Sequence, residues 1–183
     1  MDDPETIRLF ADFTRSKMLQ LLSEHPMTEA QLSAELGLTR SAIGYHLKPL
    51  KKAGLIYLYK VEAEDHGILQ KFYSPIAAFI VANYDNIPSD VKRNFIHMQI
   101  EHLRGIFTAL KLQHRFSGIS PANLEKLVIA MLKQLEKTCR DYKGKKVVKN
   151  AENIKIKIYA EALTSLTKLD EWNTLINKKT SEL

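Results

Sequence analysis

The stretch Leu32–Lys48, LSAELGLTRSAIGYHLK, decides the fold of the first part of the chain. Ser33 is small enough for a second helix to cross the first closely, and Gly37 can turn the chain in the left-handed conformation. Ile43 can fill the angle between the two helices, and Thr39 can cap the second one. The spacing of these residues therefore predicts two short helices joined by a tight turn.

Capping residues extend this helical pattern toward the N-terminus. Asp12 is expected to cap a helix over Ser16–Leu22 that ends at Glu24–Pro26. Thr28 begins the next helix, and Gln31 three residues later completes a capping box. Together with the stretch above, these signals predict three consecutive helices.

After the third helix, the sequence changes to a strand-like composition. Residues 55–61 and 68–73 are rich in aromatic and β-branched side chains, and the polar segment 62–67 separates them. This pattern predicts a β-hairpin, a wing that follows the helix-turn-helix. Ser74–Pro75 is expected to end or bend the second strand, and Ile76–Asn83 fits either a strand extension or the start of a helix.

The rest of the chain is predicted to be helical. Apolar residues recur at helical spacing in three segments, which run from Pro88 to about Gln113, from Ser120 to about Tyr142, and over roughly 147 to 177. Only Ile154–Ile158 alternates like a strand. We therefore expect a mainly α protein, with a winged helix-turn-helix domain at residues 1–83 and a helical dimerisation region at residues 84–183.

The second helix of the helix-turn-helix separates into two faces. Its apolar residues Ile43, Leu47 and Leu50 point inward, which leaves a polar outward face with the chemistry of a DNA major-groove probe. Arg40 can bind guanine or a phosphate, and the amides near Thr39 suit phosphate. The candidate DNA-contacting residues are Thr39, Arg40, Ser41, Gly44, Tyr45, His46, Lys48, Lys51, Lys52, Lys60 and Lys71.

Three of these expectations carry a specific reservation. Pro49 should bend or end the helix, which makes contacts beyond Lys48 doubtful. The acidic wing tip, Glu62–His66, would be repelled by phosphates, so wing contacts should come from the flanking Lys60 and Lys71. For His46, a structural or phosphate-anchoring role is favoured over base reading.

Residues 8–75 resemble the ArsR-type winged-helix transcriptional regulators. The resemblance is carried by Leu9–Arg15, by Leu32–Leu50 with its Ser41-x-x-x-x-His-Leu-Lys core, and by Lys51–Ile56. Longer archaeal members with a helical C-terminal region look similar in layout. The resemblance implies a homodimer that binds double-stranded DNA at an imperfect palindrome and represses transcription.

Pro49 is one departure from this family, and two others are visible in the sequence. Metal-sensing members carry a Cys-x-Cys pair where this chain has Thr28–Ala30, so thiolate sensing there is not expected. Phe13 stands where the family usually has Pro, a change that should be mild. The nature of any small-molecule effector is left open, and a winged helix used as a protein-interaction module is the alternative function.

Composition limits the remaining possibilities. The chain has 183 residues, 45% hydrophobic and 26% charged, which is typical of a globular protein. Its single cysteine, its acidic start and the absence of an apolar run longer than the seven residues Ile76–Ala82 favour a cytoplasmic protein without membrane contact. The glycines are too widely spaced for a P-loop or dinucleotide fingerprint, so no cofactor is expected and an enzyme is the least favoured class.

The formal charge of +6 lies mostly outside the predicted winged helix. Residues 1–75 carry nine Lys and Arg against ten Asp and Glu, whereas residues 137–157 carry eight against two. This basic segment is either a solvated face, which is favoured, or a second DNA contact.

Two weaker features remain open. His97, Glu101, His102 and His114 are possible metal ligands, but we favour ordinary surface or core roles for them. Cys139 could be a redox switch, but lone cysteines on amphipathic helices are more often plain core or surface residues.

Overall fold

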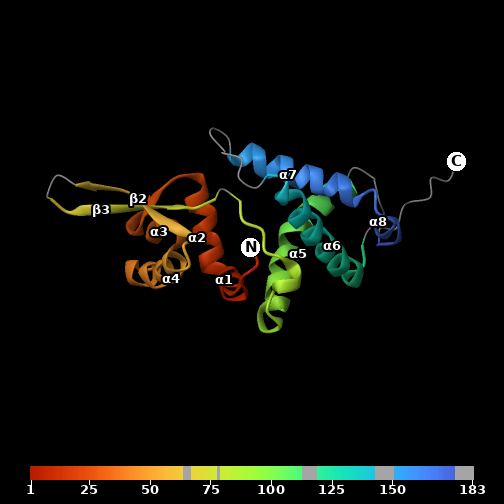
Figure 1. The fold of residues 1–183 in the computed structure, drawn as a ribbon, viewed down its shortest axis with the longest axis horizontal. Helices are drawn as coiled ribbons and strands as arrows, with labels where there is room; N and C mark the ends of the chain where they lie inside the picture. The colour runs from red at the N-terminus through yellow and green to blue at the C-terminus, as the bar shows by residue number, and fades with distance from the viewer. Residues whose placement is uncertain (64–66, 78, 113–118, 143–150, 176–183) are drawn as a thin grey trace. The chain divides into compact units, whose positions relative to one another are not determined.

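The computed structural model describes residues 1–63, 67–77, 79–112, 119–142 and 151–175. The chain folds as two compact units (Figure 1). One contains Asp3–Ile80, and the other contains Met1–Asp2 together with the helices that follow Val81. The division of function between residues 1–83 and 84–183 stays a prediction.

The first unit begins with four helices: α1 (Pro4–Phe10), α2 (Phe13–Glu24), α3 (Glu29–Leu36) and α4 (Arg40–Lys52). The predicted caps of the last three are confirmed. The Asp12 carboxylate accepts a hydrogen bond from the Arg15 amide at 2.8 Å, Thr28 and Gln31 form the reciprocal capping box, and Thr39 Oγ1 accepts from the Ala42 amide at 3.2 Å.

The turn between α3 and α4 has the predicted geometry. Gly37 adopts the left-handed conformation with φ +64°, and the Ser33 hydroxyl donates to the Leu38 carbonyl. Leu32 of α3 and Ile43 of α4 are fully buried. The two helices are therefore locked together by a capped turn and a shared apolar contact, as in a helix-turn-helix.

Pro49 was expected to bend or end the helix. Helix α4 does not end there but continues to Lys52. Proline removes its own N–H but keeps its carbonyl, and the Pro49 carbonyl accepts from the Ala53 amide at 2.9 Å. The helix closes in a Schellman arrangement, in which Gly54 has φ +67° and the Leu55 amide donates to the Leu50 carbonyl. Leu50 is fully buried and fixes this last turn to the core.

The predicted hairpin is confirmed and belongs to a three-stranded antiparallel sheet. Strands β2 (Ile56–Ala63) and β3 (Leu69–Pro75) form a ribbon that extends from the helices (Figure 1), with a bulge between Leu58 and Lys60. A further strand, β1 (Met27–Thr28), pairs with β3, so the order is β1-β3-β2. A two-residue strand is too short for sequence periodicity to reveal.

The segment after the sheet is neither the strand extension nor the helix start that the sequence allowed. Its described residues between Ile76 and Asn83 have no regular secondary structure, and a short 3₁₀ helix, η1 (Tyr84–Asn86), follows. The amino group of Met1 donates to the Val81 carbonyl at 2.9 Å, and the Asn83 amide donates to the Met1 carbonyl at 2.8 Å. Hydrogen bonds to Met1 thus satisfy part of this irregular backbone.

The second unit is helical, as predicted. Its elements after η1 are α5 (Ser89–Leu112), α6 (Pro121–Arg140), α7 (Ala151–Leu166) and α8 (Asp170–Leu175). The helix expected over roughly 147 to 177 is therefore two helices, and its outermost predicted residues lie outside the described chain. At the break after α7, the hydrogen bonds span three residues, as in a 3₁₀ turn. The Lys168 amide donates to the Ser165 carbonyl, and the Leu169 amide donates to the Leu166 carbonyl.

The strand-like alternation at Ile154–Ile158 is helical in the structure. Ile158 is buried and Ile156 is 63% exposed. Residues 154 and 158 are one helical turn apart and share a face, so the alternation fits a helix in which Ile156 alone points outward.

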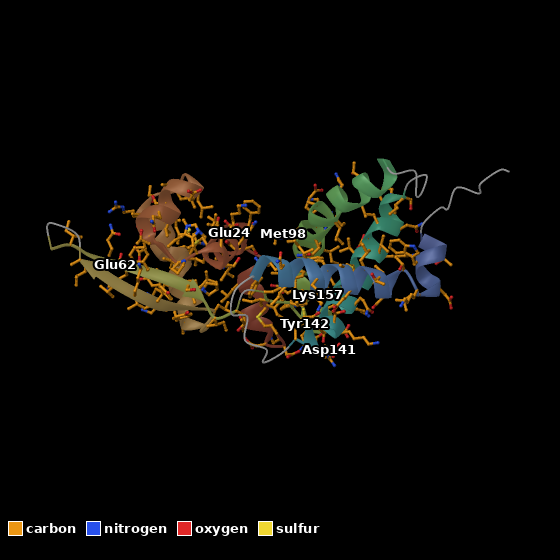
Figure 2. All side chains as sticks on the ribbon, turned by 90° about the horizontal axis from the view of Figure 1, so that it is seen from above. Glu24, Glu62, Met98, Asp141, Tyr142 and Lys157 are labelled. Atoms are coloured by element: carbon orange, nitrogen blue, oxygen red, sulfur yellow. The ribbon has the colours of Figure 1, made fainter. Side chains whose placement is uncertain are left out.

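Apolar faces of α5, α6 and α7 form the core of this unit. The buried residues are Phe95, Ile96 and Leu103 of α5, Leu127, Val128, Met131, Leu132 and Leu135 of α6, and Ile158, Ala162 and Leu166 of α7. Tyr142 follows the end of α6 (Figure 2). Its hydroxyl donates to the Glu161 carboxylate of α7, with both oxygens 2.8 Å away. Among the described residues, no helix has the length and apolar character needed to cross a membrane.

Candidate nucleic-acid interface

The outward face of α4 is the centre of the candidate site. Arg40, Ser41, Tyr45 and Lys48 are exposed, with Tyr45 73% accessible, whereas Ile43, Leu47 and Leu50 are buried. The same helix that packs into the core therefore presents a continuous polar face. Thr39, its capping residue, is also exposed and stands beside the free amides of the first turn.

The cations of α4 are available to an anionic partner. In the described part of the chain, no ion pair engages Arg40, Lys48, Lys51 or Lys52. Lys51 and Lys52 lie in the last helical turn and are exposed. Because the helix continues past Pro49, both lysines keep helical positions that the sequence had placed in doubt.

Gly44 lies in the middle of α4 and is half-buried. A Cβ built there would lie 3.8 Å from Glu29 Oε2, an ordinary van der Waals distance. The fold itself therefore has room for a side chain at this position. Glu29 also contacts Tyr73, where burial first and then the Glu29 charge raise the pKa of the phenol.

His46 faces the start of α2 instead of the outward face. Its side chain is largely buried, and Nδ1 lies 3.6 Å from Asp12 Oδ1 without forming a hydrogen bond. The His46 ring also makes an edge contact with Tyr45, with ring centroids 5.3 Å apart. The sequence favours a structural or phosphate-anchoring role for His46 over base reading, and this choice stays a prediction. Sequence reasoning missed Asp12 as the partner, since no local spacing signals a contact between distant helices.

Lys60 is already engaged within the protein. Its Nζ lies 2.6 Å from Glu62 Oε1 and 4.5 Å from the centroid of the Phe72 ring. Glu62 lies on the hairpin (Figure 2) and is part of the acidic tip, whose residues 64–66 lie outside the described chain. Lys71 is exposed and has no ion pair within the described chain. Of the two wing lysines, only Lys71 is immediately available to phosphate.

The remaining candidates are not brought together. Glu101 pairs with Arg104 at 3.3 Å, and the described residues contain no group of three metal-ligating side chains. The His102 side chain and His114 lie outside the described residues. Cys139 is half-buried, and burial raises the pKa of its thiol to about 11.

The basic segment 137–157 is described only at its two ends. At one end, Arg140 pairs with Glu136 at 2.6 Å, and at the other Lys157 lies 3.9 Å from Glu161. These two cations therefore already have acidic neighbours. The lysines from Lys143 to Lys149 lie outside the described residues.

Comparison with known proteins gives one family match, within the first unit, and similarity to solved structures. Two solved structures of ZitR from Lactococcus lactis, a single mutant and a double mutant in apo form, are similar to the chain at 17% and 20% identity. The matches cover 72% and 76% of this chain and 75% and 91% of the respective ZitR chains, with TM-scores of 0.32 and 0.33. No curated protein matches the sequence. Residues 12–57 match the family described as bacterial regulatory protein, arsR family. These residues span α2, α3 and α4 and correspond to an ArsR-family helix-turn-helix domain.

Proposed function

We propose that this regulator is a homodimeric repressor that reads a palindromic operator in double-stranded DNA with α4. The observation that supports this most directly is the exposed, acid-free cationic face of a helix whose opposite side is buried. Such a helix fits the major groove, where Arg40 can bind a guanine edge while Lys48, Lys51 and Lys52 bind phosphates.

Dimerisation follows from the geometry of B-DNA. Two copies of α4 about 34 Å apart would meet successive major-groove faces on one side of the duplex. We assign the dimer contacts to the helical region at 84–183, the layout of longer, archaeal-like members. Since such a regulator must share a compartment with the chromosome, we place it in the cytoplasm.

Selection of bound duplexes from a random pool tests the proposal. We expect an enriched site with two inverted half-sites whose centres are about 10 base pairs apart. The wild-type chain should show affinity that falls steeply with salt, as phosphate contacts require. An enriched site with a single half-site would contradict the dimer, and no enrichment would contradict sequence-specific reading.

The hairpin supports a second candidate, a winged helix that binds another protein. Four apolar side chains of β2 are exposed, since Tyr57, Leu58, Tyr59 and Val61 are each at least 41% accessible, and Lys60 is already paired with Glu62. Exposed aromatic and aliphatic side chains of this kind favour protein contacts. Salt-titrated binding to random duplex DNA separates the two functions, because an interaction module should show little affinity at any salt concentration.

A further inference from the structure

A groove of about 750 Å³ lies within the second unit, between η1, α5 and α6. Its apolar part is formed by Ile96 and Ile100 of α5 and Ile129 of α6. Its polar rim includes Lys92, Arg93 and His97 of α5. The volume is that of a small-molecule site, and the lining combines an apolar floor with a few charged groups, as such sites do.

Helical periodicity explains why these side chains share one groove. On α5, residues 92, 93, 96, 97 and 100 follow the i, i+1, i+4, i+5, i+8 spacing of a single helix face. On α6, Glu125 and Ile129 are one turn apart and line the other side. Ile96 is buried, whereas Arg93 and His97 are exposed. The groove therefore grades from apolar at its base to cationic at its rim.

The charges of the groove are not balanced internally. Within the described residues, neither Lys92 nor Arg93 nor His97 forms an ion pair. Lys92 Nζ lies 4.2 Å above the Tyr84 ring, a cation–π contact that stabilises the ammonium group without adding a negative charge. The neighbouring Lys133, by contrast, has Asp85 at 3.9 Å. Glu125 is the only acid that lines the described groove, against two permanent cations and a histidine.

We propose that this groove binds an organic anion with an apolar body, such as an aliphatic or aromatic carboxylate. The carboxylate pairs with Arg93 and Lys92, since a guanidinium matches a carboxylate in two hydrogen bonds. The apolar body covers Ile96, Ile100 and Ile129. An inorganic anion would leave these isoleucines in water, and a neutral apolar molecule would leave the cations without a partner. The site belongs to the second unit alone and does not depend on DNA binding by the first.

Titration of the full chain with octanoate tests this proposal. Isothermal calorimetry should show saturable binding at one site per chain, and the affinity should rise about fourfold for each methylene between butanoate and octanoate. The double variant Lys92→Gln/Arg93→Gln should bind octanoate at least about tenfold more weakly. Lys126→Gln, which removes an exposed cation of α6 outside the groove, should bind like the wild type.

Other results would overturn the proposal. Inorganic phosphate that binds as tightly as octanoate would indicate a simple anion site, and octanol that binds as tightly would indicate an apolar site. Octanoate affinity unchanged in the double variant would place the ligand elsewhere. If the double variant instead changed the sedimentation coefficient while octanoate failed to bind the wild type, the groove would be an interface between two copies. Because none of these measurements includes DNA, their failure is separate from failure of the proposed repressor function.

Discussion

His46 Nδ1 of α4 lies 3.6 Å from Oδ1 of Asp12, the residue that caps α2. The same carboxylate accepts a hydrogen bond from the Arg15 amide at 2.8 Å. One acidic side chain therefore both begins α2 and faces the helix that carries the candidate DNA-binding residues. The packing of α4 against α2 brings these two side chains together.

Asp12→Ala should lower the free energy of unfolding by about 1 kcal/mol, because it removes the N-cap of α2. Asp12→Asn keeps a capping oxygen and should cost less. A double-mutant cycle of Asp12→Ala with His46→Ala isolates the contact between the two side chains, and we expect a coupling energy of about 0.5 kcal/mol or more. Chemical denaturation of the full chain measures all four variants. Strict additivity would mean that the two side chains do not interact.

Arg40→Ala should relax base preference, and Lys51→Ala should weaken binding to all sequences alike. Loss of a bidentate contact to guanine costs about 1–3 kcal/mol at one base position, while loss of a phosphate contact lowers the salt slope by about 1. Gel shifts with the selected operator and with single-base variants measure both effects. If Arg40→Ala changed neither affinity nor preference, the assignment of α4 to the major groove would fail.

Gly44→Ala separates stability from binding. Gly44 is inside a helix and a Cβ there meets only an ordinary contact, so alanine should raise the free energy of unfolding by up to about 1 kcal/mol. If α4 approaches DNA closely at this position, the added methyl group should weaken operator binding at the same time. Thermal unfolding and gel shifts on the same preparation test the two effects. A more stable variant with unchanged affinity would show that Gly44 does not face DNA closely.

Glu62→Gln should strengthen binding to duplex DNA. The change releases Lys60 from its 2.6 Å ion pair and removes a negative charge from the wing, so a phosphate contact becomes possible. We expect a several-fold gain in affinity at low salt and a steeper salt dependence. Glu24→Gln is the matched control, because it removes an exposed carboxylate of the same unit at the end of α2. An equal gain in both variants would indicate general charge repulsion without a wing contact.

Local signals in the sequence were enough to predict the helix-turn-helix and its candidate face. Caps such as Asp12 and Thr28, and the turn at Gly37, act within a few residues and can be read from spacing alone. The contact between His46 and Asp12 depends on how α4 packs against α2, which no spacing reveals. The same holds for the pairing of β1 with β3, because a two-residue strand exists only through its partner.

Neighbouring groups alter what single residues such as Pro49 and Lys60 can do. Pro49 removes one hydrogen bond, but buried Leu50 and the Gly54 cap keep α4 helical to Lys52. Lys60 stays a predicted source of wing contacts, but Glu62 two residues later is close enough to pair with it. Whether Lys60 pairs with Glu62 depends on side-chain conformation, about which the periodicity of the sequence carries no information.

The Cys139 thiol should react slowly, which argues against a redox switch at this position. Burial raises its pKa to about 11, so the folded state favours the neutral thiol and about 1 in 1,000 molecules carries the thiolate at pH 8. The higher nucleophilicity of a high-pKa thiolate offsets part of this loss. Iodoacetamide should therefore alkylate the native chain at least about tenfold more slowly than the chain unfolded in urea, which is the matched control because it exposes the same thiol.

The same raised pKa makes the free energy of unfolding depend on pH. The contribution of the buried thiol is fully present below the pKa of the unfolded thiol, about 8.5, and declines as the pH rises toward 11. Equal alkylation rates in the native and unfolded states would show that Cys139 is accessible and ionises normally.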